Sequence, residues 1–197
     1  MGEPNALLRV LLVDDTQKDL GLLRDALTVA GYDVVAEARS ALDLFDHVAK
    51  CRPDVIVIDT DSPTRDALEQ VCLVTQSDPR PIVMFTADGE RDSIRAAIEA
   101  GVTTYIVEGL AAHRVRPIVE VAQARFAADR AVRAELVKTR SRLEERKLVE
   151  RAKGLLMKAR GIDEDAAFAA LRRLAMDRQS SLVDVAKQVI DAGKLLG

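Results

Sequence analysis

The sequence contains no tryptophan, and aromatic residues make up only 3% of its 197 residues. This scarcity argues against a binding site built on aromatic stacking, such as a sugar platform or the sheet of an RNA-recognition motif. Only two cysteines are present, which excludes a disulfide framework and is typical of a reducing cytoplasm. No stretch without a charged residue is longer than eight residues, and residues 1–4 lack the regions of a secretory signal. We therefore expect a cytoplasmic protein with no membrane contact.

Charge is abundant but unevenly distributed along the chain. Residues 1–110 contain 10 basic and 20 acidic side chains, whereas residues 111–197 contain 19 basic and 12 acidic ones. This asymmetry predicts two modules, and the basic module could bind a polyanion. The alternative is two solvated surfaces of opposite sign that attract each other. Charge alone leaves both interpretations open.

Short apolar segments alternate with helical patterns in the first half of the chain. Strands are expected at 10–13, 34–36, 55–58, 81–85 and 105–107, and helices at 20–30, 40–48, 65–76 and 90–100. Short β-branched strands separated by helices predict an α/β fold with a five-stranded parallel sheet covered on both faces. Ligands of such sheets bind beyond the carboxyl ends of the strands.

Polar side chains follow three of these strands at that edge. Asp14 and Asp15 follow the first strand, Asp59 follows the third and Thr86 follows the fourth. Clustered carboxylates suit Mg²⁺, and a carboxylate can accept a phosphoryl group that a threonine hydroxyl then binds. A single Asp at a strand end is more often a helix cap. The combination at three strand ends favours a phosphoryl site.

Residues 1–120 contain the motifs of a known regulatory domain. The segments 11–15, 59–66, 85–87 and 105–107 resemble those of response-regulator receiver domains, which have a flavodoxin-like fold. The resemblance implies that Asp59 is the phosphoacceptor and that Thr86, Tyr105 and Glu108 occupy the switch positions. It also implies that Mg²⁺ is bound by Asp14, Asp15, Asp59 and the backbone carbonyl of Asp61.

One position departs from that family. Receiver domains place a lysine after the fifth strand, where this sequence has Glu108. A carboxylate there would repel a phosphoryl dianion. We therefore expect control by a sensor or inhibitor protein more than by a histidine kinase. Alternatively, Glu108 is a solvated loop residue and Asp59 is still phosphorylated.

A long helix is expected to leave the receiver domain. Between residues 112 and 153 there is no glycine, and the only proline is Pro117. Apolar residues share a seven-residue register, which Asp129 interrupts; they are Val115, Ala122, Leu136 and Leu143. The register predicts a coiled-coil linker over 121–143 and a homodimer. A single solvated helix is the alternative.

Residues 144–197 predict three amphipathic helices in an all-α bundle. At about 100° per residue, six apolar residues of the first helix share one arc. Cations line both flanks of this arc: Lys147, Arg151 and Lys158 on one side, and Arg146, Lys153 and Arg160 on the other. They either extend from a core seam or contact phosphates, and charge alone leaves both readings open.

The same segment resembles a second family. The stretches 149–157, 166–172, 174–177 and 182–186 resemble the ANTAR domain, an RNA-binding antitermination module. The resemblance implies binding to stem-loops in nascent leader transcripts. The RNA contacts we expect are Lys153, Gly154, Lys158, Arg172, Arg173 and Arg178. Gly154 either permits a close approach of RNA or packs against another helix. Segment 105–110 resembles NasT-type antiterminators of nitrate assimilation, which a nitrate-sensing partner restrains.

The sequence leaves three alternative functions to consider. Asp59-Thr60-Asp61 resembles the start of haloacid-dehalogenase-like phosphatases, but no suitable lysine follows the fourth or fifth strand. A DNA-binding response regulator would need a recognition helix, and 182–190 contains only Lys187 as a basic residue. A pure interaction protein is a third possibility. We expect no catalytic residue and no enzymatic activity.

Overall fold

The computed structural model describes residues 7–16, 20–107 and 112–195. The strands are β1 (Leu8–Asp15), β2 (Tyr32–Ala38), β3 (Val55–Thr60), β4 (Ile82–Thr86) and β5 (Thr104–Val107). The helices are α1 (Leu20–Val29), the 3₁₀ turn η1 (Ala41–Asp43), α2 (Leu44–Cys51), α3 (Arg65–Ser77), α4 (Arg91–Ala100), α5 (Ala112–Arg160), α6 (Glu164–Asp177) and α7 (Leu182–Leu195). The chain forms two compact units, Met1–Arg130 and Ala131–Gly197. Among the described residues, no helix is long and apolar enough to cross a bilayer.

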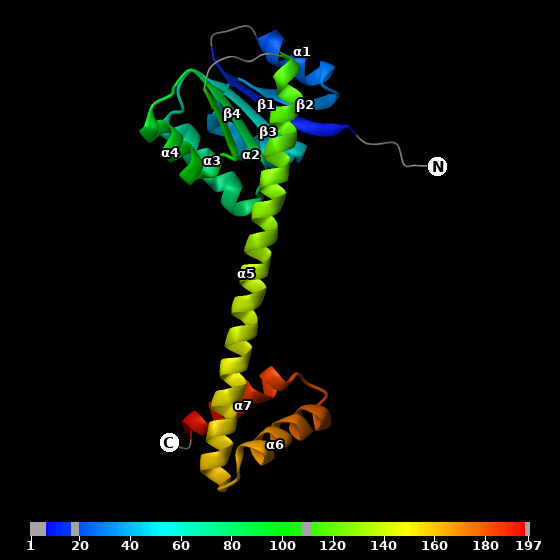
Figure 1. Ribbon diagram of the computed structural model, residues 1–197, viewed down its shortest axis with the longest axis vertical. Helices are drawn as coiled ribbons and strands as arrows, with labels where there is room; N and C mark the ends of the chain where they lie inside the picture. Colours follow the sequence, from blue (N-terminus) through cyan, green and yellow to red (C-terminus); the bar gives the residue numbers. More distant parts are fainter. Residues whose placement is uncertain (1–6, 17–19, 108–111, 196–197) are drawn as a thin grey trace, which may run out of the picture. The chain divides into compact units, whose positions relative to one another are not determined.

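The first unit is built on a five-stranded parallel sheet with the strand order β2-β1-β3-β4-β5. Helices α1 and α5 cover one face, and α2, α3 and α4 cover the other (Figure 1). This is the flavodoxin-like order, with the crossover between β2 and β3. The predicted fold class is confirmed, as is the sequence of alternating strands and helices.

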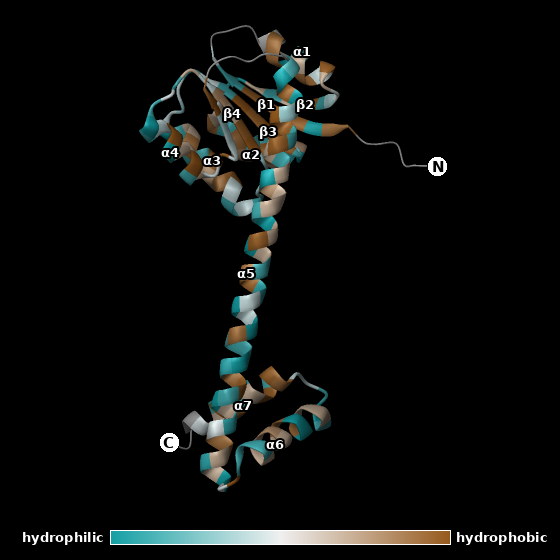
Figure 2. Cartoon of the chain, in the orientation of Figure 1, coloured by the Kyte–Doolittle hydropathy of each residue, from teal (hydrophilic) through white to brown (hydrophobic). Residues whose placement is uncertain are grey.

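The sheet separates two apolar cores because successive side chains of a strand point to opposite faces. In β1, Leu11 and Val13 pack toward α2 and α3, whereas Val10 and Leu12 pack toward α1 and α5. All four are fully buried. Figure 2 shows the central strands as mainly hydrophobic, as expected for a sheet covered on both sides.

The helix expected to begin at Ser40 begins differently. The Ser40 hydroxyl accepts a hydrogen bond from Leu42 N at 3.2 Å, so Ser40 is the cap as predicted. The first turn is η1, in which Leu44 N–H donates to the carbonyl of Ala41, three residues back. The regular helix α2 starts only at Leu44. Capping residues mark where a helix starts, but they do not distinguish a 3₁₀ turn from an α turn.

The second unit consists of the later part of α5 together with α6 and α7. A left-handed Gly161, with φ of 65°, ends α5, and the Asp163 carboxylate caps α6 by accepting from Ala166 N at 2.8 Å. The buried core is small; it contains Ala152, Leu171, Val185, Ala186 and Ile190. Three helices therefore share one compact apolar centre.

The residues that share the seven-residue register in α5 lie in two different environments. Val115 and Ala122 are fully buried against the receiver sheet. Leu136 and Leu143 are 49% and 53% exposed. The first half of the predicted coiled-coil seam is thus wrong, because those residues complete a receiver core. The exposed residues beyond Asp129 are the part of the seam that is still available to a second copy.

Candidate functional sites

The carboxyl edge of the receiver sheet brings the predicted phosphoryl-site residues onto neighbouring strands. Asp14 is in register with Asp59 on β3, and Thr60 is in register with Thr86 on β4. The Asp14 and Thr86 side chains are buried. The strand ends therefore place a carboxylate pair beside a threonine hydroxyl, as the sequence led us to expect.

The four predicted Mg²⁺ ligands are not assembled as a ready metal site. The Asp14 carboxylate accepts hydrogen bonds from Thr16 N at 3.0 Å and Thr16 Oγ1 at 2.6 Å. Asp15 is exposed, and within residues 7–16, 20–107 and 112–195 no group of three His, Cys, Asp or Glu residues could hold a metal. The oxygen ligands at this edge are nevertheless of the type that Mg²⁺ prefers.

A chain of hydrogen bonds joins Thr86 and Tyr105, two of the predicted switch residues, to the edge. Thr86 Oγ1 donates to the Asp61 carbonyl at 2.9 Å and accepts from Asp88 N at 3.1 Å. The Tyr105 hydroxyl donates to the Asp88 carbonyl at 2.8 Å. The predicted metal-ligand carbonyl of Asp61 thus already accepts from Thr86. These contacts connect the loop after β3 to Tyr105.

Asp88 bridges two loops of the candidate site, a role that the sequence did not reveal. Its carboxylate accepts from Ser62 Oγ at 2.7 Å and from Glu90 N at 2.9 Å. These bonds, that from Ser62 first, lower the pKa of Asp88 below its ordinary value. Asp88 ties the loop after β3 to the loop after β4. An isolated Asp before a glycine carries no sequence signal for such a bridge.

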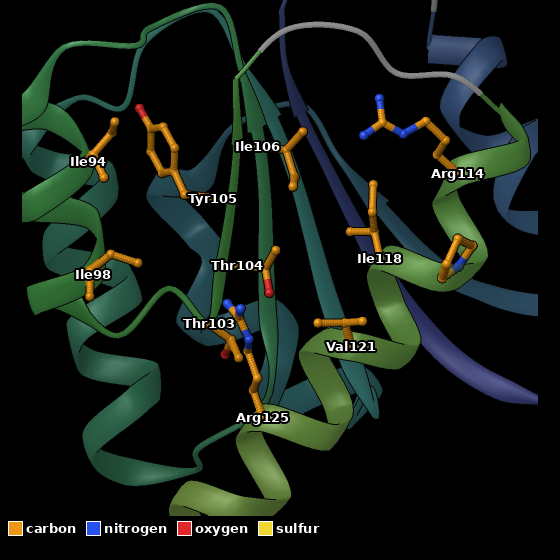
Figure 3. A pocket seen from close by; sticks show the side chains of 11 residues that line it. Ile94, Ile98, Thr103, Thr104, Tyr105, Ile106, Arg114, Ile118, Val121 and Arg125 are labelled. Atoms are coloured by element: carbon orange, nitrogen blue, oxygen red, sulfur yellow. The ribbon is translucent and has the colours of Figure 1, made fainter.

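A groove of about 550 Å³ lies beside this network, between α4, β5 and α5 (Figure 3). Ile94, Ile98 and Ile118 supply apolar surface, and Arg114 and Arg125 project from α5. Tyr105 lines the groove as well as bonding to Asp88. Tyr105 therefore connects the groove to the hydrogen-bond network of the acidic edge. Glu108, the predicted third switch residue, lies outside the described residues.

In the second unit, Lys153 is not placed as a contact for RNA. The residue is only 7% exposed, and its ammonium lies 2.6 Å from Glu164 Oε1 and 2.9 Å from Glu150 Oε1. It also lies 5.9 Å from the centre of the Phe168 ring. These contacts tie α5 to the first turn of α6. We therefore correct the expectation for Lys153: its charge is used inside the bundle.

The remaining predicted RNA contacts are at the surface. Gly154 and Lys158 on α5 are exposed, as are Arg172 and Arg173 on α6. Arg178 is exposed too, and its guanidinium donates to the Gln188 side chain of α7. Four cations therefore remain accessible to a polyanion.

The Lys153–Glu164 pair predicts an acid-sensitive second unit. The hydrogen bond from Lys153 holds the pKa of Glu164 below its ordinary value of 4.5. A carboxyl group with a lower pKa in the folded state stabilises that state above its unfolded pKa, and the contribution is lost as the pH falls. Glu164→Gln should therefore lower the Tm of the second unit at neutral pH, and the two Tm values should converge as the pH falls through the lowered pKa of Glu164. Calorimetry across pH checks this, with Asp165→Asn as the control. Parallel profiles at every pH would contradict it.

The comparisons with known proteins agree with both halves of this structure. The response regulator receiver domain family matches residues 10–120, and the ANTAR domain family matches residues 138–190. The chain belongs to the ANTAR response regulators. Both resemblances stated from the sequence are thereby confirmed. ANTAR response regulators are an antiterminator family, and their two domains are typical of regulatory, non-enzymatic proteins.

Individual relatives match either both domains or the receiver domain alone. The transcriptional regulatory protein PdtaR of Mycobacterium tuberculosis is 34% identical over 183 residues, which cover 93% of this chain and 89% of PdtaR. Chemotaxis protein CheY of Listeria monocytogenes is 28% identical over 117 residues, covering 59% of this chain and 98% of CheY. PdtaR is thus similar to both domains of this ANTAR response regulator, and CheY to its receiver.

Among solved structures, the signal receiver domain of a modulated diguanylate cyclase from Desulfovibrio desulfuricans aligns with a TM-score of 0.55 and 22% identity. It covers 62% of this chain and 98% of that domain. Chemotaxis protein CheY4 of Vibrio cholerae aligns with a TM-score of 0.51 and 24% identity, covering 58% of this chain and 98% of CheY4. At these identities the likeness establishes the receiver fold alone.

Proposed function

We propose that this protein is a transcription antiterminator that binds stem-loops in nascent leader RNA. The observation that carries the proposal is the exposed pair Arg172 and Arg173 on α6, in a segment that matches the ANTAR domain. Neither arginine forms an ion pair within the described part of the chain. Both charges are therefore available to RNA phosphates or bases.

Binding would act through competition between RNA structures. A leader stem-loop held by the protein cannot contribute its strands to an overlapping terminator hairpin. RNA polymerase then continues into the downstream genes. Side chains cannot read the narrow major groove of A-form RNA, so loop bases would supply the sequence preference and phosphates the affinity.

The full chain should be tested against three ligands at a stated salt concentration. These are a leader RNA with stem-loops upstream of a terminator, a scrambled RNA of equal length, and duplex DNA of the same sequence. We expect preference for the structured RNA and increased readthrough in transcription with purified polymerase. Preference for duplex DNA would instead support a DNA-binding response regulator. Equal binding to all three would overturn the proposal.

We further propose that the active form is a homodimer joined through α5. Val132, Leu136 and Leu143 are exposed apolar residues on the part of the helix beyond Asp129. A second copy packed along the same residues would cover them. Sedimentation of the full chain tests this, and a monomer at every concentration would contradict it.

The receiver is proposed to regulate RNA binding, with Asp59 as the phosphoacceptor and Mg²⁺ at the acidic edge. Receiver domains generally bind Mg²⁺ at this edge and interact with kinases. In the sequence, Glu108 stands at the position where receiver domains have a lysine that attracts the phosphoryl group. A sensor or inhibitor protein, acting in the control of nitrate assimilation genes, is therefore the regulator we propose first. The apolar groove beside Tyr105 is a surface that such a partner could contact.

The role of Asp59 yields a specific prediction. We expect Asp59→Asn to leave readthrough by the purified protein near the wild-type level, because Glu108 opposes a phosphoryl group at this site. Glu108→Lys should lengthen the lifetime of the acyl phosphate formed from a small phosphoryl donor. Readthrough assays and phosphate-release kinetics measure the two effects. Loss of readthrough in Asp59→Asn alone would show that phosphorylation is the switch.

A further inference from the structure

Gly154 occupies a position where no residue that the structure describes requires a glycine. It lies in the interior of α5, and a β-carbon built on it would meet no atom within 4 Å. By contrast, Gly161 has a φ of 65°, which favours glycine. Glycine in a helix interior lowers the stability of the helix relative to alanine. The packing explanation left open by the sequence is therefore excluded within the described structure.

Basic residues lie near Gly154 on one face of α5. At about 100° per residue, Lys147, Arg151, Gly154 and Lys158 lie within an arc of about 60°. We call these four residues the α5 stripe. All four are exposed. Arg151 and Lys158 form no ion pair with any residue that the structure describes, whereas Lys147 pairs with Glu144 at 2.7 Å.

The structure distinguishes the two basic flanks of α5. On the opposite flank, Lys153 is held by Glu150 and Glu164, and α6 begins beside it. The α5 stripe points away from the apolar core, with Gly154 about 160° from the centre of the apolar arc around Ala152. Of the two basic flanks, only the α5 stripe combines exposed cations with a glycine, which has no side chain.

We propose that the sugar-phosphate backbone of a bound RNA stem lies along the α5 stripe and contacts the helix backbone directly at Gly154. The inference rests on the proposed RNA-binding function. Because glycine has no β-carbon, the backbone of a ligand can approach the helix more closely at Gly154 than at any other type of residue. Lys147 and Lys158 are separated by about 16 Å along the helix, a length that spans several phosphates. Three cations favour a polyanion over a second copy, because two identical basic stripes would repel each other.

The deciding experiment separates folding from binding in the full chain. Gly154→Ala should raise the Tm of the second unit by about 4 °C, since alanine favours the helix and has room there. The same variant should bind the leader RNA about tenfold more weakly, because the added methyl group holds the phosphates away. Thr139→Ala is the matched control: it is exposed on α5, about four turns away, and should stabilise the helix without changing RNA affinity.

Charge removal tests the rest of the stripe. Arg151→Gln and Lys158→Gln should each reduce the slope of log affinity against log salt by about 0.7 to 0.9, the loss expected for one phosphate contact. Arg160→Gln removes an exposed cation from the other side of α5 and should leave the slope unchanged.

The possible outcomes distinguish this inference from the function on which it rests. If the wild-type chain shows no preference for structured RNA, both fail. If Arg172→Gln weakens binding but Gly154→Ala binds as wild type, the α5 stripe is overturned and the RNA-binding function stands. If Gly154→Ala instead changes the sedimentation of the protein without affecting RNA affinity, the face binds a second copy and the inference is wrong.

Discussion

Replacing both Arg172 and Arg173 by glutamine is expected to weaken binding to a leader stem-loop by about 10- to 100-fold at physiological salt. Both guanidinium groups are exposed on α6, on the side away from the buried Leu171. Each contact with a phosphate contributes to affinity by releasing a counterion, so the salt dependence should decrease together with the affinity. Fluorescence anisotropy across a salt series measures both quantities.

The fold should survive this double replacement, because neither side chain contributes to the apolar centre of the second unit. Arg142→Gln with Arg146→Gln is the matched control, since it removes the same charge from exposed positions on α5. A loss of general electrostatic attraction would affect both double variants equally. If the control weakens RNA binding as much as the α6 variant does, Arg172 and Arg173 have no special role and the proposed RNA interface on α6 is wrong.

The receiver fold could be read from the sequence because its signals are local. Fully apolar runs such as Val55–Ile58 predict strands covered on both faces, and the polar residues after them mark the strand ends. The register of Asp14 with Asp59 then follows from the parallel sheet. Residues adjacent to strong strand signals are thus placed well by sequence alone.

Long-range pairings could not be read in the same way. Val115 and Leu136 share a seven-residue register, yet one packs on the sheet and the other is exposed, because the receiver ends part-way along α5. Lys153 belongs to a basic flank on a helical wheel, but the turn after Gly161 brings Glu164 to its ammonium. A helical wheel describes one helix and contains no information about which flank the next helix covers.

The bridge through Asp88 illustrates the same limit in the receiver. Its partners, Ser62 and Tyr105, are 26 and 17 residues away along the chain. Each is a common loop or strand residue with no distinctive spacing. The resemblance to receiver domains identified Tyr105, and only the three-dimensional structure identified the residue that its hydroxyl binds.

The largest expected effect on stability is that of Leu171→Ala. Leu171 is fully buried at the centre of the small second unit, and removal of a buried leucine side chain costs about 2–5 kcal/mol. A unit of this size has little stability in reserve. We therefore expect the second unit of this variant to be largely unfolded at 37 °C and RNA binding to be lost. The receiver should keep its own melting transition, since its two cores contain no residue of the second unit.

Two further variants make this result specific to the core. Met176→Ala removes a side chain of similar size from the same helix, but Met176 is 75% exposed, so its cost should stay within about 0.5 kcal/mol. Leu27→Ala removes a fully buried leucine from the receiver and should lower only the receiver transition. Scanning calorimetry resolves the two transitions. If Leu171→Ala lowered the melting temperatures of both units together, the two units would unfold cooperatively. The receiver would then regulate the second unit through their shared stability, and not through a partner that binds the receiver alone.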